Sequence, residues 1–193
     1  GAAVLSLVVL ALLRRTMRVA LAVPVVAALL YAVLGNSAAL SDHPQMAAVD
    51  PEVEKMVATL AAKLEKNPGD QKGWLMLARS YKVMGRPVEA ERAYEKAGDI
   101  IENDAQELAN YADVVATNTN GKFTDKSIRI LEKALRIDPK NTMALWLTGN
   151  AAFEAGDTKT AVASWQKLLA LLPPDSDDAR ELRGAIVQAG GTV

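Results

Sequence analysis

The sequence has no cysteine, a single histidine (His43) and almost balanced charge. Without cysteine the chain can form no disulfide, no thiol nucleophile and no thiolate metal site. Its formal net charge of −1 gives no electrostatic support to nucleic-acid binding. Runs of β-branched residues are confined to the amino-terminal segment, whereas Ala, Leu, Lys and Glu dominate elsewhere. This composition predicts an all-α protein.

Catalytic motifs are missing as well. A nucleophile–His–Asp arrangement would have to use His43, which stands beside Pro44 in a stretch without apolar periodicity. The chain has no phosphate-binding glycine loop and no HExxH motif, and its acidic residues have the spacing of solvated helix faces. We therefore predict no enzyme, no cofactor and no metal site. A haem or metal ligand role for His43 is the alternative to a simply solvated side chain.

The segment Lys140–Pro174 has the pattern of two closely packed helices. Gly149 and Ala161 lack bulk, so the helices can approach each other, and Trp165 can fill the space toward the next hairpin. Gly156 suits the left-handed turn that ends the first helix. Small residues, a turn glycine, an aromatic residue and a closing proline at these spacings are typical of a tetratricopeptide (TPR) repeat.

Two further copies of this pattern lie upstream. Their matching positions are Ala78, Gly85, Ala90, Tyr94 and Ala97 in the first copy, and Ala112, Ser127, Leu131, Ala134 and Pro139 in the second. Ala78 and Ala112 are 34 positions apart, but Ala112 and Gly149 are 37 apart. We place the three extra residues in a loop at 117–124. The repeats predict three helix pairs over 70–172, the first pair reaching about Ile101.

A capping helix is predicted at each end of the array. Asp50-Pro51 has the residues of an N-cap and a first helical turn, and the helix 51–66 fits the second-helix position of an incomplete repeat. After Pro174, either Asp175 or Ser176 begins a last helix over 176–189, whose polar face suits the solvated end of a solenoid. The predicted TPR domain therefore covers 51–190.

The amino-terminal residues 1–36 are predicted to be a membrane anchor. Two apolar runs, 2–13 and 19–34, flank Arg14–Arg18. The second run covers about 24 Å as a helix, close to a bilayer core, whereas the first covers only about 18 Å. By the positive-inside rule the basic turn is cytoplasmic, and everything after the second run is exported. A signal peptide cleaved near Ser37 is the alternative, and residues 37–50 are predicted to be a tether.

The first helices of the three pairs should line a concave groove. We expect a basic end on the first pair and an aromatic end on the third, with Trp146 and Phe153 as anchors for an amphipathic helix or extended tail. Polar groups or a terminal carboxylate would be held by Lys72, Arg79 and Asn150. Packing of the two aromatic rings under the last helix is the alternative. The candidate groove residues are Lys72, Arg79, Asn110, Asp113, Met143, Trp146, Asn150 and Phe153.

Several stretches carry a resemblance to a known family. They are Pro24 with Leu30-Tyr31 and Leu34-Gly35, then DPEVEKMVATLAAKLEKNPGDQKGWLMLARSYKVMGRPVEAERAYEKA, ANYADVVATNTNG and ALRIDPKNTMALWLTGNAAFEAGD. Over 19–189 the chain resembles the CcmI (CycH) and NrfG family of c-type cytochrome biogenesis proteins. It departs from longer members, which have a sizeable loop where this chain has only Arg14–Arg18.

The resemblance implies a protein of the bacterial inner membrane whose TPR domain lies in the periplasm. It implies a chaperone that binds the carboxy-terminal helix of apocytochrome c and delivers it to the haem-ligation complex, with CcmF- and CcmH-type subunits as partners. A second hypothesis is a scaffold that holds membrane subunits of that complex together through its spans and convex face, with no client in the groove.

Overall fold

The computed structural model describes residues 50–192, and their regular structure is entirely helical. The predicted all-α fold is thereby confirmed for this part of the chain. The predicted anchor, most of the tether and His43 lie outside the described residues. Among residues 50–192, no helix is both long enough and apolar enough to cross a membrane.

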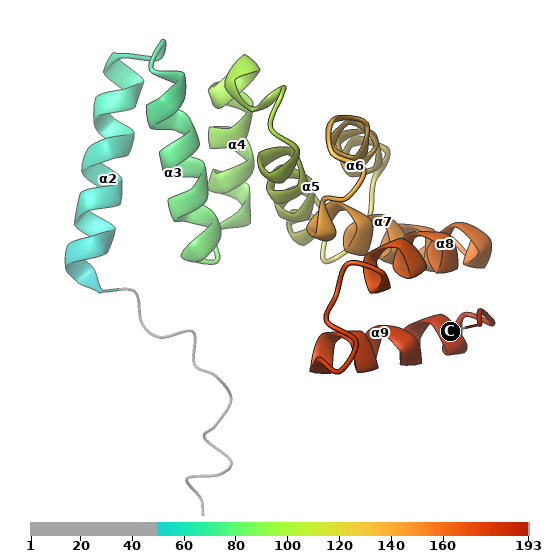
Figure 1. Ribbon diagram of the computed structural model, residues 1–193. Coiled ribbons are helices and arrows are strands. Elements are labelled where there is room, and N and C mark those ends of the chain that lie inside the picture. Colours follow the sequence, from blue (N-terminus) through green and yellow to red (C-terminus); the bar gives the residue numbers. More distant parts are fainter. Residues whose placement is uncertain (1–49, 193) are drawn as a thin grey trace, which may run out of the picture. The chain divides into compact units, whose positions relative to one another are not determined.

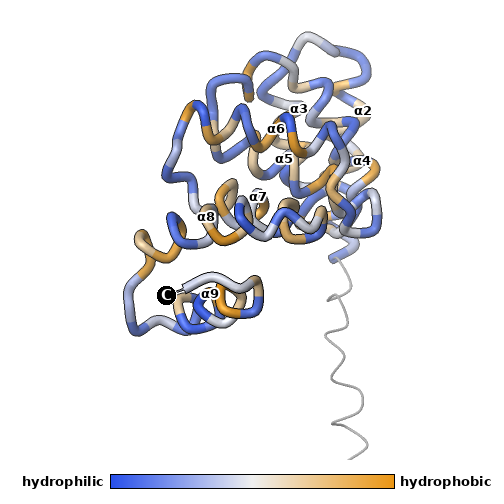
Figure 2. Tube along the Cα trace, turned by 90° about the vertical axis from the view of Figure 1, so that its right-hand side faces the viewer, coloured by the Kyte–Doolittle hydropathy of each residue, from blue (hydrophilic) through white to orange (hydrophobic). Residues whose placement is uncertain are grey.

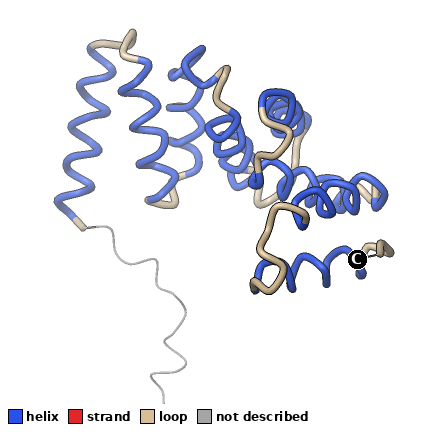
Figure 3. The backbone as a smooth tube through the Cα atoms, viewed as in Figure 1, coloured by secondary structure: helices blue, strands red, loops and turns tan. Residues whose placement is uncertain are grey.

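Three helical hairpins follow one another, with one flanking helix at each end (Figure 1). The hairpins are α3/α4, α5/α6 and α7/α8; α2 packs on α3, and α9 packs on α8. Short loops join the helices (Figure 3). The elements are α2 (Pro51–Lys66), α3 (Gln71–Val83), α4 (Pro87–Ala97), the 3-10 turn η2 (Gly98–Ile101), α5 (Ala105–Asn118), α6 (Asp125–Ile137), α7 (Thr142–Glu154), α8 (Thr158–Leu169) and α9 (Asp177–Gln188).

Short polar side chains begin every α-helix of the described residues except α4, by accepting hydrogen bonds from otherwise unpaired backbone N–H groups. The Asp50 carboxylate accepts from the N–H of Glu52 at 2.8 Å, and Asp70 accepts from Gly73 at 2.9 Å. Ser176, rather than Asp175, caps α9, because its hydroxyl accepts from the N–H of Ala179.

The second helix of the first pair is shorter than predicted. α4 ends at Ala97, and Gly98 has a φ of 58°, which diverts the chain into the 3-10 turn η2. Such a φ is outside the helical region, so a helix continuous to Ile101 cannot form. The extra residues of the middle pair lie between α5 and α6, where Asn120 and Gly121 also have positive φ.

The hairpin α7/α8 is closely packed around one ring. Trp165 is 3% exposed and packs with Leu145, Leu182 and Ile186, so it links its own hairpin to α9. A Cβ atom at Gly149 would lie 2.1 Å from the Trp165 indole nitrogen, which explains why this position in the middle of α7 has no side chain. Hydrophobic and hydrophilic residues are interspersed along the helices (Figure 2).

Lys126 ties α4 to α6 by two ion pairs. Its ammonium lies 2.7 Å from Glu91 and 2.6 Å from Glu95, and the other Glu91 oxygen accepts from the Asn118 amide at 2.6 Å. Burial acts to raise the pKa of Glu91, but the hydrogen bonds from Lys126 and Asn118 outweigh it, so this pKa lies below its usual value. The ionised Glu91 carboxylate therefore stabilises the folded state.

Glu91→Gln is expected to lower the free energy of unfolding by about 1 kcal/mol at neutral pH. Because the folded-state pKa is the lower one, the carboxylate stabilises above its unfolded pKa of about 4.3, and the stabilisation is lost as the pH falls through the folded value. Urea unfolding at several pH values should show wild type and variant converging once the pH is below the folded-state pKa. Glu95→Gln is the control, since the more exposed Glu95 carboxylate should contribute less; a pH-independent difference for Glu91→Gln would contradict the expectation.

Candidate functional site

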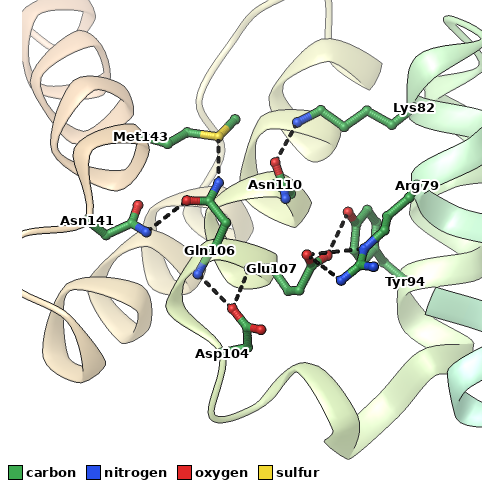
Figure 4. A network of polar contacts seen from close by, with 9 residues as sticks. All are labelled: Arg79, Lys82, Tyr94, Asp104, Gln106, Glu107, Asn110, Asn141 and Met143. Carbon is green, nitrogen blue, oxygen red and sulfur yellow. Dashed lines mark hydrogen bonds and ion pairs between the residues drawn. The ribbon is translucent and has the colours of Figure 1, made fainter. Parts of the chain in front are cut away.

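A polar network joins the first helices of successive pairs (Figure 4). At the α3 end, the Arg79 guanidinium donates to one oxygen of Glu107 from two nitrogens, at 2.8 and 3.2 Å. The other Glu107 oxygen accepts a 3.4 Å hydrogen bond from the Tyr94 hydroxyl. Burial first, and then the Glu107 charge, raise the pKa of Tyr94, so this hydroxyl stays protonated. Arg79 is thus occupied by a carboxylate of the chain itself.

The next cation of α3 is paired in the same way. The Lys82 ammonium lies 3.1 Å from the Asp113 carboxylate and donates to the Asn110 side-chain oxygen at 2.8 Å. Asn110 and Asp113 both belong to α5, so two candidate groove residues bind a neighbouring helix. The basic character expected at the α3 end is largely neutralised by α5.

The network continues from α5 to α7. The Gln106 side chain accepts from the Asn141 amide at 3.1 Å and donates to the Met143 sulfur at 3.4 Å. Asn141 also begins α7 by accepting from the N–H of Ala144 at 2.8 Å. The position of Met143 is therefore set by the same contacts that fix the start of α7.

The aromatic end lies on α7. Trp146 and Phe153 are 42% and 40% exposed, and neither is sealed by α9. Their ring centroids lie 6.3 and 5.6 Å from that of the buried Trp165, respectively. One side of each ring thus packs against the core, and the other side is exposed to solvent. Large aromatic groups held in this way are preferred anchors for a bound polypeptide.

A hollow of about 340 Å³ opens beside Trp146, and we refer to it as the α7/α9 hollow. It is lined by Thr142, Met143, Trp146, Leu168, Leu172, Asp178, Glu181 and Leu182. Most of these side chains are apolar, and they come from α7, from α8 and the loop after it, and from α9. A second hollow of about 330 Å³ lies between α2 and α3, with the exposed Met76 and Val83 on its wall.

Comparison with known proteins places this arrangement in a family. Residues 35–179 match the family model described as "Cytochrome c-type biogenesis protein H TPR domain". The chain belongs to this family. The match covers most of the sequence and every helix from α2 to α8, and it confirms the resemblance to c-type cytochrome biogenesis proteins.

Relatives of this TPR family are recognisable at moderate identity. The chain is 29% identical to the cytochrome c-type biogenesis protein CycH of Pseudomonas aeruginosa, over 88% of this chain and 42% of that protein. It is 28% identical to CcmH of Escherichia coli K12, over 72% of this chain and 40% of that protein. It is 26% identical to NrfG, a formate-dependent nitrite reductase complex subunit of E. coli O157:H7, over 63% of this chain and 61% of that protein. The chain thus spans less than half the length of the first two relatives.

The fold comparison agrees with the family assignment. The crystal structure of MamA superposes with a TM-score of 0.57 at 16% identity, covering 71% of this chain and 84% of MamA. At this identity the similarity shows the fold alone. It supports the TPR solenoid predicted from the repeat spacing.

The remaining candidate groove residues of this TPR domain make fewer contacts. Lys72 is exposed near the start of α3 and forms no ion pair with any residue of 50–192. Asn150 is partly buried on α7, and its side chain makes no hydrogen bond within the described region. α5 lies between α3 and α7 (Figure 1), so Lys72 and Asn150 are at different ends of the array.

Two residues of the α7/α9 hollow were not anticipated as site residues. Asp178 and Glu181 are exposed carboxylates of α9, and both line the hollow beside Trp146. The buried Leu182 follows Glu181 directly, and Asp178 stands four positions before Leu182, one helical turn away. The periodicity of α9 could therefore have placed both carboxylates at the edge of its apolar side.

Proposed function

We propose that this chain is a membrane-anchored TPR chaperone of cytochrome c maturation, which holds the carboxy-terminal helix of apocytochrome c and presents it to the haem-ligation complex. Family membership supports a role in cytochrome c biogenesis. The observation that carries the client-binding step is the pair of exposed rings, Trp146 and Phe153, which both pack on Trp165. Trp146 also lines a largely apolar hollow.

A helical client segment fits the spacing of the two exposed rings. An amphipathic helix presents apolar side chains every three or four residues along one face. The two exposed rings are seven positions apart on α7, which is about two turns or 10 Å along its axis. One apolar face of a bound helix can therefore cover both rings.

The proposed location and partners of the chaperone are inferred from the sequence and from the family. The basic turn Arg14–Arg18 before the apolar run 19–34 favours export of the repeats to the periplasm of a bacterial inner-membrane protein. CcmF- and CcmH-type subunits of the haem-ligation complex are the proposed partners. The chain contributes the client-binding surface, and haem attachment is assigned to these partners.

Trp146→Ala is expected to weaken binding of an apocytochrome c carboxy-terminal peptide at least about tenfold, because a central aromatic anchor contributes about 2 kcal/mol or more. The measurement is a fluorescence-anisotropy titration of the labelled peptide with the full chain in non-ionic detergent. Phe153→Ala should weaken the same interaction. Circular dichroism would establish that both variants remain folded.

Ile128→Ala is the matched control, because Ile128 is also a partly exposed apolar residue (37%) but belongs to α6 and does not line the hollow. Its affinity should equal that of wild type. Absence of saturable binding, or an affinity that neither aromatic substitution changes, would refute client binding at this surface.

A chain truncated after Asn36 distinguishes the scaffold hypothesis from the chaperone hypothesis. A scaffold that acts through its membrane spans would still assemble the haem-ligation complex. A chaperone would lose cytochrome c maturation.

A further inference from the structure

The α7/α9 hollow carries charge of one sign only. Asp178 and Glu181 are the only charged residues among those that line it, and they stand three positions apart on α9. The other lining residues contribute apolar side chains or, in Thr142, a hydroxyl. The hollow is therefore an apolar surface with an acidic edge.

These two carboxylates differ from the two acidic residues of α5 that face α3, which are neutralised within the chain. Glu107 and Asp113 pair with Arg79 and Lys82. By contrast, no basic side chain of residues 50–192 forms an ion pair with Asp178 or Glu181.

The structure of α9 explains only one of the two charges. Asp178 lies in the first helical turn, where a carboxylate is favoured by the positive end of the helix dipole. Glu181 is beyond that turn, so the dipole gives little reason for an acidic residue there. It is exposed at the edge of the hollow, next to the buried Leu182.

We propose that the hollow selects an amphipathic helix that carries a lysine or arginine beside its apolar anchor. The apolar side chain enters next to Trp146, and the neighbouring cation pairs with Asp178 and Glu181. This proposal rests on the proposed function and specifies which client helices the site prefers. Complementary charge at the edge of an apolar surface contributes mainly to specificity.

A free terminal carboxylate fits the same place poorly. It would meet two negative side chains at the α9 end, and at the α3 end Arg79 is already bound to Glu107. Lys72 is the remaining candidate cation for such a group. The chemistry of the groove therefore favours an internal, basic stretch of a helix over a chain terminus near Trp146.

The test uses two synthetic helical peptides of about 18 residues with the same leucine stripe. One carries lysine and the other glutamate at the positions flanking the stripe. Affinities for the full chain in non-ionic detergent are measured by anisotropy, alongside the apocytochrome c peptide. We expect the lysine peptide to bind about tenfold tighter than the glutamate peptide at low salt, and the difference to shrink as salt is added.

Substitutions on α9 should remove or invert this preference. D178N/E181Q should bind both peptides equally, and D178K/E181K should prefer the glutamate peptide. The matched control D125N/E132Q makes the same change of charge on α6, again with one carboxylate in the first helical turn, and should keep the wild-type preference. Thermal unfolding followed by circular dichroism verifies that α9 remains folded in each variant.

The outcomes separate this proposal from the proposed function. If wild type binds both peptides equally, or if the preference survives in D178N/E181Q, the charge selection is refuted while client binding stands. If the lysine, glutamate and apocytochrome c peptides all fail to bind, both proposals are overturned.

Discussion

Gly149→Ala is expected to lower the free energy of unfolding by about 2–3 kcal/mol, although alanine is the better helix former by about 1 kcal/mol. The added methyl group would lie 2.1 Å from Nε1 and 2.3 Å from Cδ1 of Trp165. That ring is buried between α7 and α9 and cannot move without opening the core around Leu182. Chemical unfolding followed by circular dichroism gives the difference directly.

Gly184→Ala on α9 is the matched control for this substitution. A Cβ atom there meets nothing within 4 Å, so alanine should stabilise the protein by up to about 1 kcal/mol. Trp165→Phe added to Gly149→Ala should recover part of the lost free energy of unfolding, because the smaller ring leaves room for the methyl group. Equal stability of wild type and Gly149→Ala would show that α7 and α8 are not packed as described.

Arg79→Met is expected to lower the free energy of unfolding by about 2–3 kcal/mol. Glu107 is 5% exposed, and removal of its cation leaves a buried carboxylate whose remaining side-chain hydrogen bond comes from Tyr94. Breaking a buried pair in this way typically costs about 3–5 kcal/mol. We expect somewhat less here because the Arg79 side chain is itself half exposed, which lets water replace part of the interaction.

A double variant distinguishes charge burial from lost packing. Glu107→Gln added to Arg79→Met removes the unpaired charge while keeping an oxygen that can accept from Tyr94, so most of the lost stability should return. Arg129→Met, at an exposed α6 position without an ion pair among the described residues, should change stability by less than about 0.5 kcal/mol. If the double variant is no more stable than Arg79→Met, the loss of stability comes mainly from the lost packing of the Arg79 side chain.

The helical array could be predicted because each hairpin repeats the same local requirements. Gly156 adopts the positive φ expected at a helix end, and Gly149 lies against Trp165 where a small residue was required. Asp50 and Asp70 accept the hydrogen bonds expected of N-caps. These features depend on the chemistry of a few adjacent residues and on helix periodicity, both of which the sequence contains.

The charge pattern of the groove could not be predicted, because it depends on contacts between hairpins. Arg79 and Glu107 are 28 residues apart, and their pairing depends on how α3 lies against α5. The sequence suggested a free basic end, whereas the structure pairs Arg79 and Lys82 with residues of α5 and leaves an acidic edge on α9. The end of α4 at Gly98 was missed because a glycine is compatible with both helix and turn.

The proposed function requires that a client helix covers the exposed rings of α7 during cytochrome c maturation. It is tested most directly by a photo-crosslinking residue at position 146 of the full chain, in intact membranes of cells that produce a c-type cytochrome. We expect an adduct with apocytochrome c that disappears when the client lacks its carboxy-terminal helix. A probe at position 187, which is more exposed than position 146 and lies on α9 outside the hollow, should give none. Failure to capture the client at position 146, or equal capture at both positions, would contradict client binding at the α7 rings.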